Sequence, residues 1–156
     1  MLWHKHKNSP EWEETDTIID NWLQERQELL IVYQQISQSK GYSSESFDKE
    51  LLSIFCEILV DYVSAGHFEV FEKLAKASEI CEKSGLDPKL LVEILKSTMT
   101  ALEFSEKYSL PNFKFKNLKL DLSKVGEKLS HRLDLEDQLI GAYLNATHLL
   151  KKTQQN

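Results

Sequence analysis

The spacing of apolar residues, in a chain with few glycines and prolines, most constrains this fold. Only 5 glycines and 3 prolines occur in 156 residues, so the chain has few points at which it must turn. Between these points apolar residues recur every three or four positions, as on one face of an α-helix. The stripes are wide, which is typical of helices that pack on one another in a bundle rather than of an extended coiled coil. The sequence therefore predicts an all-α fold.

Periodicity and turn residues divide the chain into about five helices, at residues 10–40, 46–62, 68–85, 88–107 and 121–149. Proline at position 10 favours an early start for the first helix, with a cap at Thr15 or Asp16 as the alternative. Asp87 and Pro88 predict the fourth start. The connector 108–119 is expected to be a packed loop, since a lone strand there would have no partner.

We expect one domain over residues 1–156, a helical bundle with a four-helix-bundle-like core and a long C-terminal helix. Residues 1–14 are expected to be partly mobile, and residues 151–156 to form a frayed tail. No apolar run approaches the roughly 18 residues of a membrane span. Cys56 and Cys81 lie in amphipathic segments, which favours free thiols over a single disulfide. A cytoplasmic, reduced protein is the expectation.

The formal charge of −6 is concentrated in the first half of the chain. Residues 11–28 hold seven acids against Arg26, and residues 45–61 hold five acids against Lys49. An acidic surface argues against direct binding of nucleic acid, which requires a basic footprint. It suits a basic partner, although the same charges could simply be a solvated surface that keeps the protein soluble.

The patterns of catalytic and metal chemistry are missing from the sequence. None of the five histidines follows a glutamate by three residues, and neither His-Glu-x-x-His nor Cys-x-x-Cys occurs. The glycines are scattered singly, so no phosphate-binding loop is present. We therefore expect no cofactor and no metal, and a protein that binds other molecules rather than an enzyme.

One predicted helix corner is unusually polar. The stretch LVDYVSAGHFEVFEKL, residues 59–74, places Asp61, Ser64, Gly66 and His67 within seven positions. If Gly66 adopts the left-handed conformation that ends a helix, Asp61 lies in the last turn, where the helix dipole disfavours a carboxylate. Two interpretations remain open: a buried network in which Asp61 accepts a hydrogen bond from Ser64 or His67, or a cluster that faces a partner or a pocket.

Three motifs on three predicted helices carry a resemblance. They are Trp22-Leu23-x-x-Arg26-x-x-Leu29-Leu30-x-x-Tyr33, Asp61-Tyr62-x-Ser64-Ala65-Gly66-His67-Phe68 with Glu72, and Gly126-Glu127-x-Leu129-x-x-Arg132-x-x-Leu135-Glu136-Asp137-x-Leu139. In this order they resemble the Rsd/AlgQ family of bacterial anti-sigma factors, over roughly residues 17–74 and 122–146.

The resemblance implies an all-helical protein that binds the primary sigma factor of RNA polymerase. The expected target is the C-terminal domain of sigma, a helix-turn-helix unit that reads the −35 promoter element. Binding would block the contacts of sigma with core enzyme and DNA, regulate transcription negatively, and favour sigma exchange in stationary phase. Further signalling-protein partners are also implied, whereas membrane binding is not. The rival hypothesis is a helical ligand-sensing or signalling-adaptor module with a polar pocket at the Asp61 and His67 corner.

Carried over by motif, the predicted partner contacts are four corner residues, three residues of the first helix and two of the last: Asp61, Ser64, His67, Phe68; Trp22, Arg26, Leu30; Glu136, Asp137. Structural alternatives accompany several of them. Trp22 and Phe68 lie on apolar stripes and fit the core equally well. Arg26 has the alternative of pairing with an inward acid, Asp61 or Glu136, and so holding the bundle together.

Overall fold

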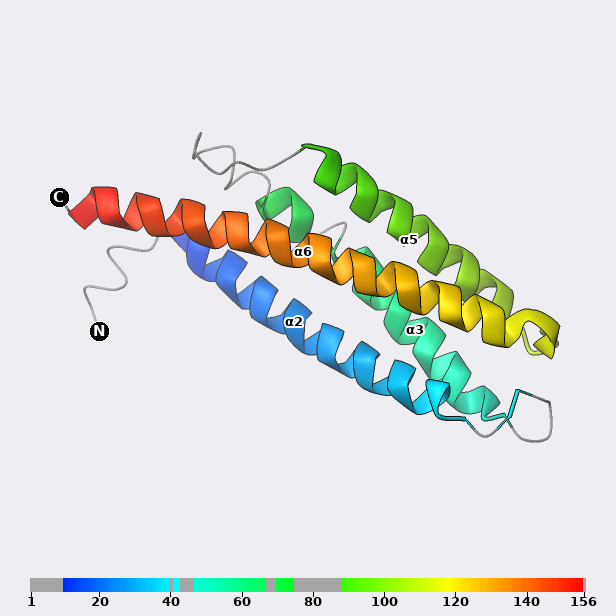
Figure 1. Ribbon diagram of the computed structural model, residues 1–156. Helices are drawn as coiled ribbons and strands as arrows, with labels where there is room; N and C mark the ends of the chain where they lie inside the picture. Colours follow the sequence, from blue (N-terminus) through cyan, green and yellow to red (C-terminus); the bar gives the residue numbers. More distant parts are fainter. Residues whose placement is uncertain (1–9, 40, 43–46, 67–69, 75–87, 156) are drawn as a thin grey trace.

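The computed structural model describes residues 10–39, 41–42, 47–66, 70–74 and 88–155. Over these ranges the elements are α2 (Pro10–Ser37), α3 (Lys49–Ala65), α5 (Pro88–Tyr108), the 3₁₀ helix η2 (Phe115–Asn117) and α6 (Leu118–Gln155). The same ranges contain no β-strand, which confirms the all-α prediction. Figure 1 shows an elongated bundle in which α6 runs along the full length and α2, α3 and α5 lie roughly parallel to it.

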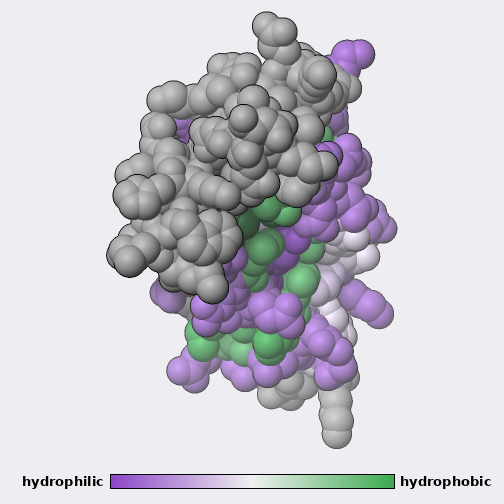
Figure 2. Space-filling model, turned by 90° about the vertical axis from the view of Figure 1, so that its left-hand side faces the viewer, coloured by the Kyte–Doolittle hydropathy of each residue, from purple (hydrophilic) through white to green (hydrophobic). Residues whose placement is uncertain are grey.

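The core of the bundle is formed by the inward stripes of all four long helices. Helix α3 packs against both α2 and α5, and α5 packs against α6. Fully buried side chains occur on every one of these helices, including Leu29, Phe55, Ile94 and Leu139. Figure 2 shows the bundle end-on, with hydrophilic residues over much of the surface and a strip of hydrophobic residues between them. None of the helices described combines the length and hydropathy that a membrane span requires.

Two helix starts coincide with their predicted signals. Helix α2 begins at Pro10, as the early start predicts, and α5 begins at Pro88. Asp87, the predicted cap of α5, lies outside the described residues. The cap of α3 is Asp48, whose carboxylate accepts a hydrogen bond from the backbone N–H of Leu51 at 3.0 Å.

The helix ends differ from the predictions. Helix α2 ends at Ser37, before Gly41, where we expected it to stop. Helix α6 begins at Leu118, earlier than predicted, because η2 leads straight into it, and it continues through residues 151–155. Most of the predicted helix 68–85 lies outside the described residues, although residues 71–74 are helical.

The connector between α5 and α6 contains no strand, as predicted, but its loop is confined to residues 109–114, because η2 and α6 take up the rest. Its two phenylalanines form a ring cluster with neighbouring aromatic residues. Phe113 meets Tyr108 edge-on, with ring centroids 5.5 Å apart, and Phe115 meets Phe47 at 6.0 Å. These contacts anchor the loop to the core. Cys56, in the adjoining helix α3, is buried and free.

Gly66 does not take the left-handed conformation that we expected. Its φ and ψ are −55° and −48°, so the chain stays right-handed and the Gly66 N–H donates to the carbonyls of Tyr62 and Val63. The prediction that this glycine ends the helix through a positive φ is wrong. A Cβ at position 66 would lie 3.0 Å from Trp22 Cζ2 and 3.2 Å from Arg132 Nη2. Phe71 Cζ would lie at 3.1 Å, so three large side chains approach the backbone closely here and leave little room for a Cβ.

Candidate functional site

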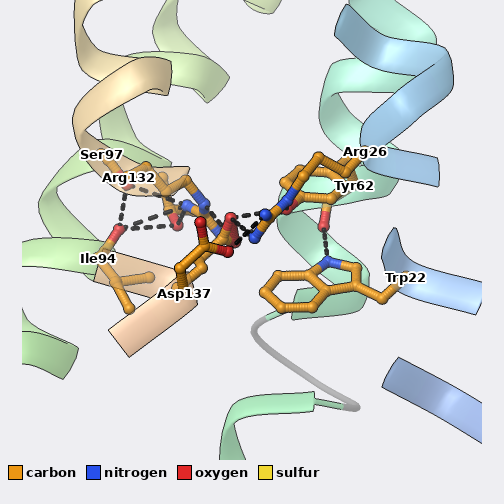
Figure 3. A network of polar contacts seen from close by, with 9 residues as sticks. Trp22, Arg26, Tyr62, Ile94, Ser97, Arg132 and Asp137 are labelled. Atoms are coloured by element: carbon orange, nitrogen blue, oxygen red, sulfur yellow. Dashed lines mark hydrogen bonds and ion pairs between the residues drawn. The ribbon is translucent and has the colours of Figure 1, made fainter. Parts of the chain in front are cut away.

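A buried ionic pair on α6 is the centre of the site. Arg132 and Glu136 lie four residues apart, and Arg132 Nε donates to Glu136 Oε2 at 3.3 Å. Their side chains are 1% and 0% exposed. Glu136 also accepts a 2.6 Å hydrogen bond from the Tyr62 hydroxyl on α3. Figure 3 shows this network between α6 and the helices that carry Arg26 and Tyr62.

Arg26 of α2 completes the network from the opposite side. It donates to the Tyr62 hydroxyl at 3.1 Å, to Asp137 at 2.6 Å and to Glu136 at 3.5 Å. Its guanidinium also lies over the Trp22 ring, 5.7 Å from the centroid. The predicted pairing of Arg26 with an inward acid is therefore confirmed, and the acid is Glu136 rather than Asp61. Four predicted site residues thus meet in one network, since Trp22 and Arg26 come from α2 and Glu136 and Asp137 from α6.

Arg132 ties the same network to α5. Its Nη1 donates to Thr98 Oγ1 at 2.5 Å, to Ser97 Oγ at 3.1 Å and to the Ile94 carbonyl at 3.4 Å. The guanidinium also lies 5.5 Å from the centre of the Phe71 ring. Arg132 belongs to the motif of the last predicted helix, but the sequence alone predicted no role for it. Its spacing of four residues from Glu136 was the available signal.

Trp22 is a core residue in this structure, as its alternative interpretation predicts. It is 2% exposed, stacks on Tyr62 with centroids 5.2 Å apart, and meets Phe71 edge-on at 5.5 Å. Its indole N–H points to the Tyr62 carbonyl at 3.4 Å. Leu30 is half-buried and packs against the same core. These contacts fix the end of α3 against α2.

The titration of the network follows from its burial. Burial raises the pKa of the Glu136 carboxyl, and Arg132, Tyr62 and Arg26 offset part of that rise. Burial and then the charge of Glu136 raise the pKa of Tyr62 well above its ordinary value. The Tyr62 hydroxyl therefore stays protonated and acts as a donor to the carboxylate. In the fully buried pair the Arg132 guanidinium balances the Glu136 carboxylate, which is the condition under which such groups tolerate burial.

The polar corner is split between the core and the surface. Tyr62 and Gly66 are buried, Ser64 is half-buried and Asp61 is exposed. Exposure of Asp61 does not fit a buried network around its carboxylate. His67 and Phe68 lie outside the described residues. Asp61 borders an open groove of about 350 Å³, which is also lined by Cys56, Glu57, Val60 and Ser109.

Fold and site together define the class of protein. It is an all-α bundle whose charged motif residues meet at a buried centre, beside the exposed acids Glu57 and Asp61 of α3. The family model described as regulator of RNA polymerase sigma(70) subunit, Rsd/AlgQ, matches residues 1–144. The chain therefore belongs to the Rsd/AlgQ family, which confirms the resemblance inferred from its motifs.

Curated relatives agree with this membership. The chain is 32% identical over 140 residues to the regulator of sigma D of Yersinia enterocolitica, covering 81% of this chain and 80% of the relative. It is 34% identical over 125 residues to the regulator of sigma D of Sodalis glossinidius, covering 79% and 85%. No solved structure gives a significant match.

Proposed function

We propose that this protein is a cytoplasmic anti-sigma factor that acts by binding rather than by catalysis. Its target is the C-terminal domain of the primary sigma factor of RNA polymerase. Binding keeps this domain from core enzyme and from −35 promoter DNA, which regulates transcription negatively and favours exchange of sigma factors in stationary phase. The proposal is supported by membership of the Rsd/AlgQ family and by relatives named regulator of sigma D.

The observation that carries the proposal is the placement of Asp61. Its neighbour Tyr62 is stacked on Trp22 and hydrogen-bonded to Glu136 at 2.6 Å, so the backbone beside Asp61 is firmly held. The Asp61 carboxylate itself is exposed. An acid presented on a fixed backbone is suited to a basic helix-turn-helix domain, because little conformational entropy is lost on binding.

The motif residues accordingly divide into two roles. Trp22, Arg26 and Glu136 are buried or half-buried and position the helices. Asp61 and Asp137 face solvent, and the Asp137 side chain is 60% exposed. We assign the direct contacts to Asp61, Ser64 and Asp137, together with His67 and Phe68 by motif. Loss of binding in variants of the first group would then follow from altered packing.

Asp61→Ala tests the proposal at the predicted contact. We expect the variant to fold normally, since the side chain is exposed, and to bind purified primary sigma factor roughly tenfold more weakly, because a charged contact is lost. Isothermal titration calorimetry measures the affinity, and circular dichroism checks the fold. The matched control is Asp134→Ala, an exposed acid on α6, which should bind like the wild type.

Co-purification from the source organism gives the broader test. Recovery of the primary sigma factor free of core polymerase would support sequestration, whereas recovery of holoenzyme, or of no sigma factor, would contradict it. The ligand-sensing alternative is less well supported. The groove beside Asp61 is open, whereas small-molecule sites usually enclose most of the ligand surface.

A further inference from the structure

An exposed apolar stripe runs along α5, outside its buried face. Val92, Leu95, Met99 and Leu102 are 51%, 44%, 59% and 38% exposed. Their spacing of three, four and three residues places them in one line along the helix. Single exposed apolar residues are common on protein surfaces, but four in one stripe are typical of a surface that another helix covers.

The line of this stripe leads along α5 toward Ser109, which lines the groove beside Asp61. Leu95, Leu102 and Ser109 are spaced by seven residues, and Ser109 directly follows the last residue of α5, with its N–H donating to the Ser105 carbonyl at 2.9 Å. They therefore lie on one line of the α5 surface. Ser109 lines the groove, and Ser105 Oγ donates to the Cys56 carbonyl of α3 at 3.5 Å. The apolar stripe thus follows the edge of α5 nearest to α3.

The opposite wall of the groove is acidic. Glu57 and Asp61 lie one turn apart on α3, both are exposed, and both line the groove with Val60. The surface therefore passes from an apolar stripe on α5, across a groove with Val60 in its wall, to two carboxylates on α3.

We propose that the α3–α5 groove binds one amphipathic helix of the sigma C-terminal domain, with its apolar face on the α5 stripe and its basic edge against Glu57 and Asp61. The inference rests on the proposed function. Charge complementarity selects this occupant, since helices of a DNA-reading domain carry lysine and arginine beside an apolar face. The stripe, at 1.5 Å per residue, accommodates about three turns of helix. Glu57 and Met99 become specificity residues that the family motifs do not include.

Substitutions on the two walls test this assignment with the full chain and purified primary sigma factor. Met99→Glu buries a charge against the partner's apolar face, and Glu57→Lys opposes its basic edge, so each should weaken binding roughly tenfold. Glu57→Lys should act mainly on the association rate and reduce its salt dependence. The matched controls are Leu144→Glu and Asp134→Lys, which alter an exposed leucine and an exposed acid on α6 and should change affinity less than about twofold.

The outcomes separate this inference from the proposed function. Wild-type affinity in Met99→Glu and Glu57→Lys, with weakened binding in Asp61→Ala, overturns the groove assignment and leaves the anti-sigma proposal standing. No binding of sigma by the wild type overturns both. A photocrosslinking amino acid at position 99 identifies the occupant directly. Capture of a basic sigma helix supports the inference, whereas capture of a second copy of this chain overturns it.

Discussion

At the scale of single residues, two glycines of α6 have opposite surroundings. A Cβ built on Gly126 would lie 1.9 Å from the Tyr33 hydroxyl oxygen, whereas a Cβ on Gly141 would meet nothing within 4 Å. Tyr33 crosses the helix at Gly126 and donates to the Leu122 carbonyl at 3.1 Å. Gly126 is therefore a packing requirement of the α2–α6 contact, while Gly141 is not.

The same substitution should consequently have opposite effects at these two positions. Gly126→Ala forces Tyr33 out of its site, and we expect a loss of about 2 kcal/mol in the free energy of unfolding, even after the gain in helix propensity. Gly141→Ala gains propensity without a clash and should stabilise by roughly 0.5–1 kcal/mol. Urea denaturation measures both. Stabilisation by Gly126→Ala would show that Tyr33 relocates without cost.

The network of Arg26, Tyr62 and Glu136 could be predicted from the sequence only in part. The pairing of Arg26 with Glu136 could be predicted, because both residues belong to motifs on amphipathic helices. The part played by Tyr62 could not, since it depends on how the end of α3 brings this hydroxyl within reach of both Arg26 on α2 and Glu136 on α6. Gly66 illustrates a second limit. Glycine is required both where φ is positive and where another group approaches closely, and the sequence does not separate the two.

At the scale of the elements, the helices themselves could be predicted, but only some of their bounds. Starts carry local chemical signals, namely Pro10, Asp48 and Pro88. The start of α6 is held by tertiary contacts instead. Asp121, in the first turn of α6, accepts hydrogen bonds from Lys107 at 2.7 Å and Tyr108 at 2.5 Å. This clamp fastens the end of α5 to the start of α6.

Asp121→Asn tests the clamp through its pH dependence. Burial disfavours the charged Asp121, but the hydrogen bonds from Lys107 and Tyr108 outweigh it and hold its pKa below the ordinary 3.8. A lowered pKa in the folded state gives stability that is present above pH 3.8 and is lost as the pH falls through the folded value. We therefore expect Asp121→Asn to lose about 1 kcal/mol at pH 7.

Denaturation of the wild type and Asp121→Asn at several pH values checks the sign. The difference between the two proteins should be constant near neutrality and should shrink in the acid range. Asp134→Asn, at an exposed position on the same helix, serves as the control and should follow the wild type throughout. A difference that persists unchanged in strong acid would mean that the charge of Asp121 is not the source of the stability.

At the scale of the whole molecule, the buried network joins the four long helices at one level. Arg26 comes from α2, Tyr62 from α3, and Arg132 and Glu136 from α6, while Arg132 also holds α5 through Ser97, Thr98 and the Ile94 carbonyl (Figure 3). The same network lies behind the end of α3 that presents Asp61. Stability and presentation of the acidic surface are therefore coupled, and the sequence motifs contain residues of both kinds.

A double-mutant cycle on Arg132 and Glu136 separates these two contributions. Arg132→Leu removes a buried cation from Glu136, and we expect a loss of about 3–5 kcal/mol. Glu136→Leu leaves Arg132 without its carboxylate and should cost a similar amount. The double variant removes both charges together, so it should be clearly more stable than the sum of the single losses predicts. Strict additivity in urea denaturation would contradict a direct interaction between the two side chains.

Sigma binding by the same variants then shows what the network contributes to function. Asp61 and Glu57 are retained in all of them, so a double variant that folds cooperatively should keep most of its affinity for the primary sigma factor. The single variants should lose binding only as far as their unfolded fraction grows, because a protein that binds only when folded has its apparent affinity reduced by that fraction. If the stable double variant binds as poorly as Asp61→Ala, the charges of Arg132 or Glu136 contribute to recognition itself, and the assignment of these two residues to a positioning role is wrong.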